Sequence, residues 1–251
     1  MRLAGKVAIV TGAVGNIGLA TTRLFLQEGA SVLLVDKEEA RLREVVKDFD
    51  PRNAEIFAAD VTKEAEVEAY VRYAVEQFGG IDIFFNNAGV EGPITKIADY
   101  PEEGFDQVMD VNAKGVFFGV KHGLPKMREW GSMIITSSIM GLKGGVRSIG
   151  YSASKHAVIG IMRAAAKDAG PRHIRVNTIH PGFVKSEMLG RIQKRNAALG
   201  LPADDAFYMA QVPFGIYVTP HEIAQTVLFL ASDDSRQVTG QTIAIDGGYM
   251  L

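Results

Sequence analysis

Short apolar runs alternate with longer, helix-like segments along almost the whole chain of 251 residues. The apolar runs are rich in β-branched residues, and such runs are typical of strands that are covered on both faces of a parallel sheet. Strand-length runs alternating with crossover helices predict a doubly wound α/β fold, a mostly parallel seven-stranded sheet with helices on both faces. The seven expected strands are residues 7–10, 32–35, 54–57, 81–85, 133–135, 174–177 and 242–245, and the clearest helices are 17–28, 63–78, 104–127 and 150–168.

Length and composition favour one domain over residues 1–251, which is long enough to bury a core without staples. The chain has no cysteine, which excludes disulfides and thiolate chemistry, and its five histidines lack paired ligand spacing, so we expect no metal site. The formal net charge of −2 predicts neither a nucleic-acid nor a membrane partner. The start of the chain lacks the features of a signal peptide, and no apolar run approaches the ~18 residues of a membrane span. We therefore expect a cytoplasmic protein that acts on a small molecule.

One stretch, residues 185–217, breaks the alternation of strands and helices. It carries apolar side chains such as Met188, Phe207 and Tyr208 but has no strand-like run. We expect one or two short helices over the open end of the sheet. The stretch is interpreted as a substrate-covering segment that closes over bound substrate.

The first expected strand leads into a glycine-rich turn, Thr11–Gly18, and then into a helix. Glycines let the backbone turn tightly and approach a ligand, and the helix N-terminus offers free N–H groups to a pyrophosphate. This context favours a dinucleotide site of the Rossmann-like kind over a tight turn without a ligand. The cofactor contacts expected here are Gly12, Gly15, Asn16, Ile17 and Gly18.

Asp36 ends the second expected strand, 18 residues beyond Gly18. A carboxylate there can accept hydrogen bonds from the adenosine ribose, and it repels a 2′-phosphate, so Asp36 predicts NAD rather than NADP. The alternative is that Asp36 caps the next helix. Lys37 follows directly and leaves NADP open.

Tyr151 and Lys155 are four residues apart in an expected helix and therefore share one face of it. A tyrosine has a pKa of about 10, and a nearby ammonium group lowers that value. Tyr151 could then take the proton from an alcohol while hydride leaves its carbon. Such a pair is common on surface helices, but here Ser138 ends a strand thirteen residues upstream.

Together with Asn86–Gly89 at a strand end and Asn112 within an expected helix, these motifs resemble the short-chain dehydrogenase/reductase family in its single-domain form of about 250 residues. The resemblance extends over nearly the whole chain, to Asp246–Gly248. It implies an NAD-dependent oxidoreductase that transfers hydride between the cofactor and a secondary alcohol or ketone. The catalytic residues that it implies are Asn112, Ser138, Tyr151 and Lys155.

The resemblance also implies a role for each of these residues. Tyr151 would be the general acid/base, Lys155 would lower its pKa and bind the nicotinamide ribose, and Ser138 would hold the substrate oxygen. Asn112 would hold a helix kink and a water molecule that links Lys155 to solvent. The further cofactor contacts implied are Asp60, Val61, Asn87, Ala88, Gly89, Tyr151, Lys155, Pro181, Gly182, Val184 and Ser186.

Two residues depart from the pattern of the family. Asn16 stands where glycine is usual, and asparagine tolerates left-handed backbone better than other non-glycine residues. Ser186 stands where threonine is more common, and it keeps the hydroxyl group. We expect neither departure to prevent cofactor binding.

The residues expected near the reacting centre are mostly apolar, which predicts a hydrophobic or cyclic secondary alcohol. The expected substrate contacts are Ser138, Met140, Leu142, Tyr151, Phe183 and Met188. The resemblance also suggests a homotetramer. Two other functions stay open, an NADPH-dependent ketoreductase and a non-catalytic protein that senses dinucleotides with the same fold.

Overall fold

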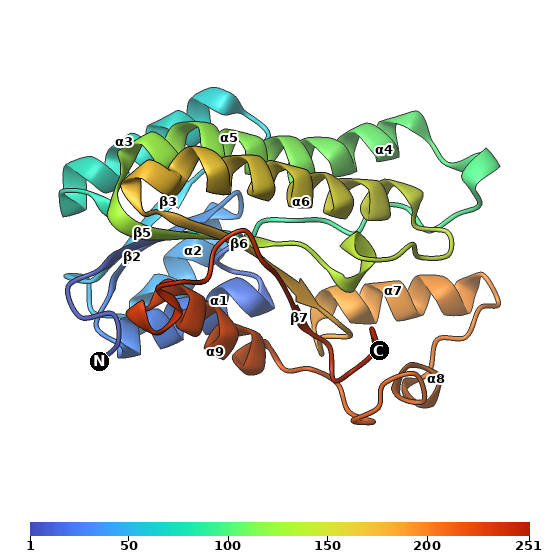
Figure 1. Ribbon diagram of the computed structural model, residues 1–251. Helices are drawn as coiled ribbons and strands as arrows, with labels where there is room; N and C mark the ends of the chain where they lie inside the picture. Colours follow the sequence, from blue (N-terminus) through green and yellow to red (C-terminus); the bar gives the residue numbers. More distant parts are fainter.

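A single seven-stranded parallel sheet forms the centre of the computed structural model, which describes residues 1–251 (Figure 1). Every neighbouring pair of strands is parallel. The order across the sheet is β3-β2-β1-β4-β5-β6-β7. The predicted doubly wound fold is therefore confirmed. The strands are β1 Val7–Thr11, β2 Ser31–Asp36, β3 Ala54–Ala58, β4 Ile81–Asn86, β5 Met127–Thr136, β6 Arg175–Pro181 and β7 Thr242–Ile245.

Helices cover both faces of the sheet (Figure 1). One face carries α1 (Asn16–Gln27), α2 (Glu39–Val45) and α9 (Pro220–Ala231), and the other carries α3 (Glu64–Phe78), α5 (Gly115–Gly123) and α6 (Ile149–Ala169). Helix α4 (Glu102–Met109) packs along α6. Helices α7 (Glu187–Ala198) and α8 (Asp205–Met209) belong to the segment 185–217 and lie beyond the carboxyl ends of the strands (Figure 1). None of the helices is long and apolar enough to span a membrane.

Each inner strand supplies side chains to two separate hydrophobic cores because successive residues of a strand point to opposite faces. In β2, Val32 and Leu34 join the core beneath α1 and α9, whereas Leu33 and Val35 join the core beneath α3, α5 and α6. All four side chains are fully buried. The apolar runs of the sequence are nearly continuous because helices cover both faces of the sheet.

Two expected elements differ from those observed. Strand β5 begins at Met127 rather than at residue 133, and its pairing with β4 shifts register between Ile81 and Ile83. Its first part carries the exposed residues Arg128, Glu129 and Trp130, which hide the strand from an apolar pattern. Strand β6 extends beyond residue 177 to Pro181. Proline has no backbone N–H group, but this costs little at the last residue of a strand.

The chain winds outward in two directions from β1 and β4. From β1 it proceeds to β2 and β3, and from β4 it proceeds to β5, β6 and β7. The crevice outside the carboxyl ends of β1 and β4 is therefore the topological switch point, where ligands bind in open α/β sheets. The Thr11–Gly18 turn and the Asn86–Gly89 motif both lie at these strand ends.

At the amino ends of the strands, a buried carboxylate joins the three central strands β1, β4 and β5. Asp82 of β4 accepts hydrogen bonds from the backbone N–H of Val7 (2.9 Å) and from Arg128 Nη1 (2.7 Å). Lys6 Nζ lies 3.9 Å from the same carboxylate. Asp82 thus fixes the starts of β1 and β5 relative to β4.

Replacing Asp82 by alanine leaves the Val7 N–H group buried without a partner and removes the ion pair of Arg128. We predict that Asp82→Ala lowers the free energy of unfolding by about 1–3 kcal/mol, as measured by urea denaturation. The matched control is Asp48→Ala, which removes an exposed ion pair with Arg23 and should change stability by less than about 0.5 kcal/mol. Equal effects of the two variants would contradict this assignment.

Candidate active site

The glycine-rich turn is closed by contacts that only glycine permits. Gly12 has a left-handed φ of +64°, and a Cβ on Gly18 would collide with the Gly12 carbonyl oxygen. The Gly15 N–H group donates to that same oxygen (3.2 Å), and α1 begins at the next residue with no side chain capping it. The first N–H groups of α1 are therefore free beside the turn. This arrangement fits the pyrophosphate of a dinucleotide.

Asn16 takes the place of a glycine without using its tolerance of left-handed backbone. Within the turn only Gly12 has a positive φ, and Asn16 is the first residue of α1. Asn16 therefore does not need the tolerance of left-handed backbone that asparagine has. Its side chain instead accepts a hydrogen bond from the Glu187 N–H group of α7 (3.1 Å).

Asp36 lies at the carboxyl end of β2 against the same turn. Its two oxygens accept hydrogen bonds from the N–H groups of Val14 (3.3 Å) and Glu38 (3.2 Å). Asp36 is not the capping residue of α2, which follows Glu38. Arg41 of α2 donates to the Val14 carbonyl oxygen (3.3 Å). The turn therefore has a carboxylate and a guanidinium group as neighbours, and the sequence analysis missed the guanidinium group.

A hydrogen-bond network joins the carboxyl ends of β1, β4 and β5. The Asn87 amide donates to the Thr11 carbonyl oxygen (3.1 Å) and accepts from the Thr136 hydroxyl group (3.0 Å). The Thr11 hydroxyl oxygen accepts from the N–H groups of Asn87 (2.9 Å) and Ala88 (3.1 Å). Gly89 follows, and a Cβ there would lie 3.2 Å from the amide oxygen of Asn112. The Asn87–Gly89 motif thus fixes the crevice at the switch point.

Asp60 and Val61, two of the expected cofactor contacts, follow β3. The Asp60 carboxylate accepts from the N–H group (2.9 Å) and the hydroxyl group (2.8 Å) of Thr62. Burial raises the pKa of Asp60, but these hydrogen bonds and the charge of Lys63 outweigh it, so the net shift is downward. Val61 packs against Gly115 at the start of α5.

Ser138, Tyr151 and Lys155 are brought together by β5 and α6. Ser138 and Lys155 are buried, and Tyr151 is half-buried. The Lys155 Nζ atom lies 5.7 Å from the centroid of the Tyr151 ring and donates to the Thr136 carbonyl oxygen (2.8 Å). The four-residue spacing thus places a phenol and an ammonium group side by side.

Burial governs the ionisation of both groups. It raises the pKa of Tyr151, an effect that the hydrogen bond of Ser138 opposes and the negative charge of Glu91 reinforces. The net shift is upward, opposite in direction to the lowering that the resemblance implies. Burial also lowers the pKa of Lys155 to about 8. The two shifts move the pKa values apart, so in the dinucleotide-free protein the Tyr151 hydroxyl group holds its proton more tightly than the Lys155 ammonium group does.

His180 of β6 holds the backbone of Ser138. Its Nδ1–H group donates to the Ser138 carbonyl oxygen (2.8 Å), and its Nε2 atom accepts from the Thr178 hydroxyl group (2.9 Å). Burial lowers the pKa of His180, which favours the neutral ring that this pair of bonds requires. The Ser138 hydroxyl oxygen itself accepts from the Met140 N–H group (3.1 Å). The sequence analysis did not single out His180, although it precedes the Pro181–Gly182 motif.

Asn112 is fully buried in a π-helical turn, Asp110–Lys114, between α4 and α5. Its amide accepts from the Val90 N–H group (2.8 Å) and donates to the Val90 carbonyl oxygen (2.9 Å). It also donates to the Ser154 hydroxyl group (3.1 Å). Asn112 therefore clamps the loop after β4 to α6, beside Lys155.

The Pro181–Ser186 stretch leads from β6 into α7. A Cβ on Gly182 would lie 2.8 Å from the Asp246 backbone, and Val184 forms a parallel bridge with Val218. The Ser186 hydroxyl group donates to the Val184 carbonyl oxygen (3.1 Å) and accepts from Leu189 N–H (3.3 Å), so it caps α7. This cap gives Ser186 a structural role besides the predicted cofactor contact.

The predicted substrate contacts occupy different surroundings. The Phe183 ring packs edge-on against Tyr208 and Tyr249, at centroid distances of 4.9 and 5.0 Å. Met140 is half-buried in the short turn after Ser138, and Met188 is half-buried in the first turn of α7. Leu142 is exposed at the end of the same short turn. Phe183 is thus the contact with the most clearly apolar surroundings.

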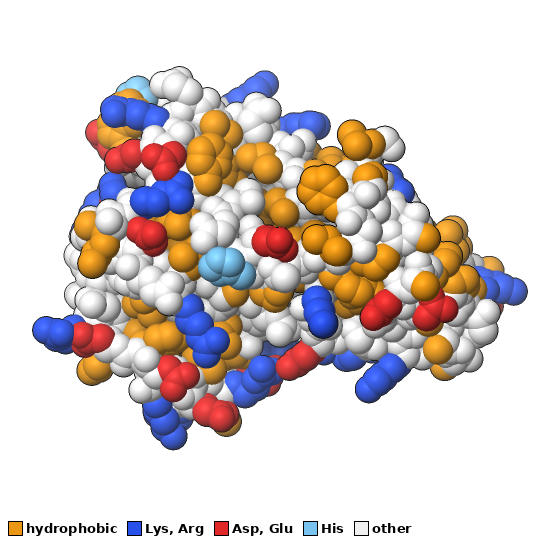
Figure 2. Space-filling model, turned by 90° about the horizontal axis from the view of Figure 1, so that it is seen from below, with side chains coloured by type: hydrophobic (Ala, Val, Ile, Leu, Met, Phe, Trp, Pro, Cys, Tyr) orange, Lys and Arg blue, Asp and Glu red, His pale blue; other side chains and the backbone are white.

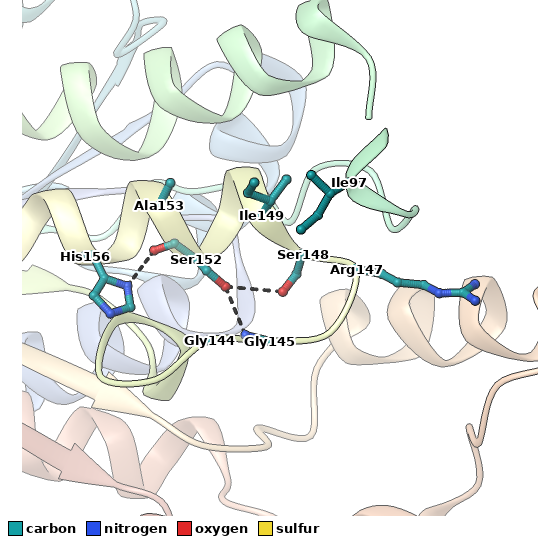
Figure 3. Close-up of a pocket in the computed structure, with 9 residues that line it drawn as sticks. All are labelled: Ile97, Gly144, Gly145, Arg147, Ser148, Ile149, Ser152, Ala153 and His156. Atoms are coloured by element: carbon teal, nitrogen blue, oxygen red, sulfur yellow. Dashed lines mark hydrogen bonds between the residues drawn. The ribbon is translucent and has the colours of Figure 1, made fainter. Parts of the chain in front are cut away.

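A hollow of about 350 Å³ lies on the outer side of the α6 N-terminus (Figure 3). Its polar lining is tied together by Ser152, whose hydroxyl oxygen accepts from Gly145 N–H (3.2 Å). Ser138, Tyr151 and Lys155 do not line it, although Ser152 and Ala153 directly follow Tyr151. Its lining residues are Ile97, Gly144, Gly145, Arg147, Ser148, Ile149, Ser152, Ala153 and His156. No cluster of three or more acidic, histidine or cysteine side chains could hold a metal ion.

Comparison with known proteins agrees with this geometry. A family model described as enoyl-(acyl carrier protein) reductase matches residues 12–250. The chain is 38% identical to the 3-oxoacyl-(acyl-carrier-protein) reductase FabG of Thermotoga maritima, over the full length of both proteins. It is also 38% identical to short-chain dehydrogenase reductase 3c of Arabidopsis thaliana, covering 100% of this chain and 96% of that protein.

Two solved structures have the same fold. Levodione reductase superposes with a TM-score of 0.92 at 36% identity and covers 98% of both chains. The NAD⁺-bound xylitol dehydrogenase superposes with a TM-score of 0.94 at 34% identity and covers 99% of this chain and 100% of that one. The chain therefore belongs to the short-chain dehydrogenase/reductase family of oxidoreductases, which bind nicotinamide dinucleotides.

The buried ammonium group of Lys155 should destabilise the protein at neutral pH. Between about pH 8 and the pKa of an exposed lysine, near 10.4, Lys155 is neutral when folded but charged when unfolded, so unfolding binds a proton and stability rises with pH. We predict that Lys155→Met is more stable than the parent at pH 7 by about 1–3 kcal/mol, and that the difference shrinks above pH 8.

Urea unfolding of the dinucleotide-free protein between pH 6.5 and 9.5 measures this difference. Lys167→Met, which removes an exposed lysine of the same helix, is the matched control and should change stability by less than about 0.5 kcal/mol. A Lys155→Met protein that is less stable than the parent at every pH would contradict the prediction.

Proposed function

We propose that this oxidoreductase transfers hydride between NAD(H) and a secondary alcohol or its ketone, with Tyr151 as general acid/base. The observation that carries the proposal is the meeting of Tyr151, Lys155 and Ser138 beside a phosphate-binding turn, at the switch point of the sheet. A proton-transferring group, a neighbouring cation and a hydroxyl group are the parts that oxidation of an alcohol requires.

Each of these residues has a distinct task in this proposal. The Ser138 hydroxyl group, held in place by His180 through the backbone, positions the substrate oxygen near Tyr151. The Tyr151 hydroxyl oxygen accepts the alcohol proton, and it returns that proton in the reverse direction. The Lys155 ammonium group stabilises the phenolate form, because an opposite charge nearby favours an ionised group. The dinucleotide, when bound, supplies the hydride acceptor or donor.

Asn112 has a supporting task in the same proposal. Its amide joins the Val90 backbone to the Ser154 hydroxyl group. Ser154 directly precedes Lys155 on α6, so these bonds fix the helix turn that carries the ammonium group. The π-helical turn around Asn112 supports the helix kink that the resemblance implies, because such turns are a common cause of kinks. Proton exchange between Lys155 and solvent through a water molecule at this kink stays a prediction.

Tyr151→Phe is the direct test of the proposed chemistry. We predict that it lowers turnover about 10³-fold or more, because the proton carrier is lost. The Kd of NADH should stay within about twofold of the parent value, because the dinucleotide is held mainly by the turn and by Asp36. Turnover is measured with a panel of cyclic and aliphatic secondary alcohols and NAD⁺, and NADH binding by its fluorescence.

The control is Tyr73→Phe, which removes a hydroxyl group on α3 and should leave turnover unchanged. Near-normal activity of Tyr151→Phe would exclude the proposed mechanism. A parent protein that binds NADH tightly but oxidises no alcohol and reduces no ketone of the panel would favour the dinucleotide-sensing alternative.

Asp36 supports NAD as the cofactor, and the solved xylitol dehydrogenase with NAD⁺ bound is a relative of the same fold. Arg41 supports the alternative of NADP, because a guanidinium group beside the turn can accommodate a 2′-phosphate. The FabG relative, a 3-oxoacyl reductase by name, keeps an NADPH-dependent ketoreductase as the second candidate. We favour NAD because the Asp36 carboxylate itself lies against the turn, where it accepts a hydrogen bond from the Val14 N–H group, and a carboxylate at that position repels a 2′-phosphate.

Asp36→Ala removes the carboxylate that would bind the ribose hydroxyl groups and repel a 2′-phosphate. We predict that the ratio of kcat/KM for NAD⁺ to that for NADP⁺ falls by about 10- to 100-fold. The control is Glu44→Ala, which removes an exposed carboxylate of α2 and should change the ratio little. An unchanged ratio in Asp36→Ala would remove Asp36 from the ribose site.

A hydrophobic or cyclic substrate is supported by the aromatic contacts of Phe183 with Tyr208 and Tyr249. The segment 185–217, with α7 and α8, is proposed to cover this substrate. Exposed Phe105, Phe117 and Ile149 on α4, α5 and α6 support the proposed homotetramer.

A second apolar surface also supports assembly. Hydrophobic side chains gather on the half of one face where α8 and the C-terminus lie (Figure 2), and Phe214, Ile216 and Leu251 are strongly exposed. Large exposed patches of this kind mark interaction sites. A cytoplasmic location stays a prediction.

A further inference from the structure

Helix α7 is attached to the glycine-rich turn at its first residue. The Glu187 N–H group donates to the Asn16 Oδ1 atom (3.1 Å), a bond between residues 171 positions apart. A glycine at position 16 has no side chain that could make this bond. The residue that departs from the family pattern therefore joins the segment 185–217 to the turn that would hold the dinucleotide.

The same helix is attached to the loop after β4 by two arginines. Glu91 accepts hydrogen bonds from Arg191 Nε (2.8 Å) and Nη2 (3.2 Å), a bidentate arrangement of the strong kind. Arg195 Nη1 lies 3.4 Å from the same carboxylate and donates to the Gly92 carbonyl oxygen (3.0 Å). The Glu91 side chain is only 10% exposed, whereas the two arginines are about half exposed.

Glu91 is also connected to the reacting centre. It directly follows Val90, which the Asn112 amide clamps through both backbone groups. The negative charge of Glu91 contributes to the raised pKa of Tyr151, so the carboxylate lies within electrostatic reach of the phenol. The ion-pair cluster thus joins α7 to the loop that borders the catalytic residues.

The cluster differs from an ordinary surface ion pair. Exposed pairs contribute little because water screens the charges and two flexible side chains must be ordered. Arg72 and Glu76, 3.8 Å apart along α3 with both side chains more than half exposed, form such a pair. Glu91 instead has a shielded carboxylate, three nitrogen neighbours and partners about 100 residues away in the chain.

We propose that Asn16 and Glu91 are positioning residues that fasten α7 across the crevice, at the phosphate-binding turn and at the catalytic loop. The inference rests on the proposed function in one respect, that the turn holds a dinucleotide. A ligand that orders the turn then also orders Asn16 and the start of α7. By reciprocity, a docked α7 favours the ligand by the same factor.

Hydrogen exchange of the α7 amides, residues 187–198, tests the attachment without any turnover. In the dinucleotide-free protein we expect Asn16→Gly and Glu91→Gln each to exchange about tenfold faster than the parent in α7, with no change in β1 or β4. Arg72→Gln is the matched control and should exchange like the parent throughout. Parent-like exchange of α7 in both variants would overturn the proposal.

NADH titration with the same readout tests the link to the turn. We expect NADH to slow hydrogen exchange in α7 of the parent. The factor by which NADH slows this exchange should be about fivefold smaller in Asn16→Gly than in the parent. Equal slowing in the two proteins would overturn the link. If the parent does not bind NADH at all, the proposed function fails, and the exchange of the dinucleotide-free variants still decides the attachment.

Kinetics separate positioning from a purely structural role. Because the charge of Glu91 also acts on Tyr151, the variants for this test are Asn16→Gly and Arg191→Gln. We expect the KM of the alcohol to rise about tenfold in both, with kcat within about threefold of the parent, and Arg191→Lys to recover part of the loss. A fall in kcat with unchanged KM in both variants would overturn the assignment.

Discussion

The bond between the Lys155 ammonium group and the Thr136 carbonyl oxygen is the interaction on which the reacting centre depends. A buried ammonium group is costly, and the lowered pKa of Lys155 expresses that cost. The carbonyl oxygen belongs to the last residue of β5, so the sheet itself provides the partner. The Thr136 hydroxyl group donates to Asn87, which in turn donates to the Thr11 carbonyl oxygen. A path of hydrogen bonds through Thr136 and Asn87 therefore connects the cation to the beginning of the glycine-rich turn.

This path explains why the centre lies where the strands diverge. Thr11, Asn87 and Thr136 end or follow three adjacent parallel strands, and parallel strands bring their carboxyl ends to one edge. Helix α6 then needs only to lay Tyr151 and Lys155 along that edge, on one side of the helix. The relative positions of Tyr151, Lys155 and the glycine-rich turn are thus set by the sheet and α6, whereas α7 is held by the Asn16 side chain at its first residue and by its own Arg191 and Arg195 farther along.

Much of the fold could be predicted because its signals are local. Strand β2 could be read from a run of β-branched and apolar residues, since both of its faces are buried. The start of β5 could not be predicted, because the exposed side chains of Arg128 and Trp130 interrupt the apolar pattern of the strand. Tyr151 and Lys155 could be paired from helix geometry alone. The partners Arg41 and His180 could not be found, because each acts through a backbone group that is distant in sequence.

The π-helical turn around Asn112 changes the phase of a helix as well as its direction. An α-helix advances about 100° per residue, so one additional residue in a turn rotates everything beyond it by roughly that angle. The apolar stripe of α5 is consequently offset from that of α4, which lets Phe118 reach the core while Asn112 faces the Val90 backbone. Deleting any single residue between 110 and 114 would restore a regular helix but turn one of these two surfaces away from its partner. The number of residues in this turn is therefore as constrained as the identity of the asparagine within it.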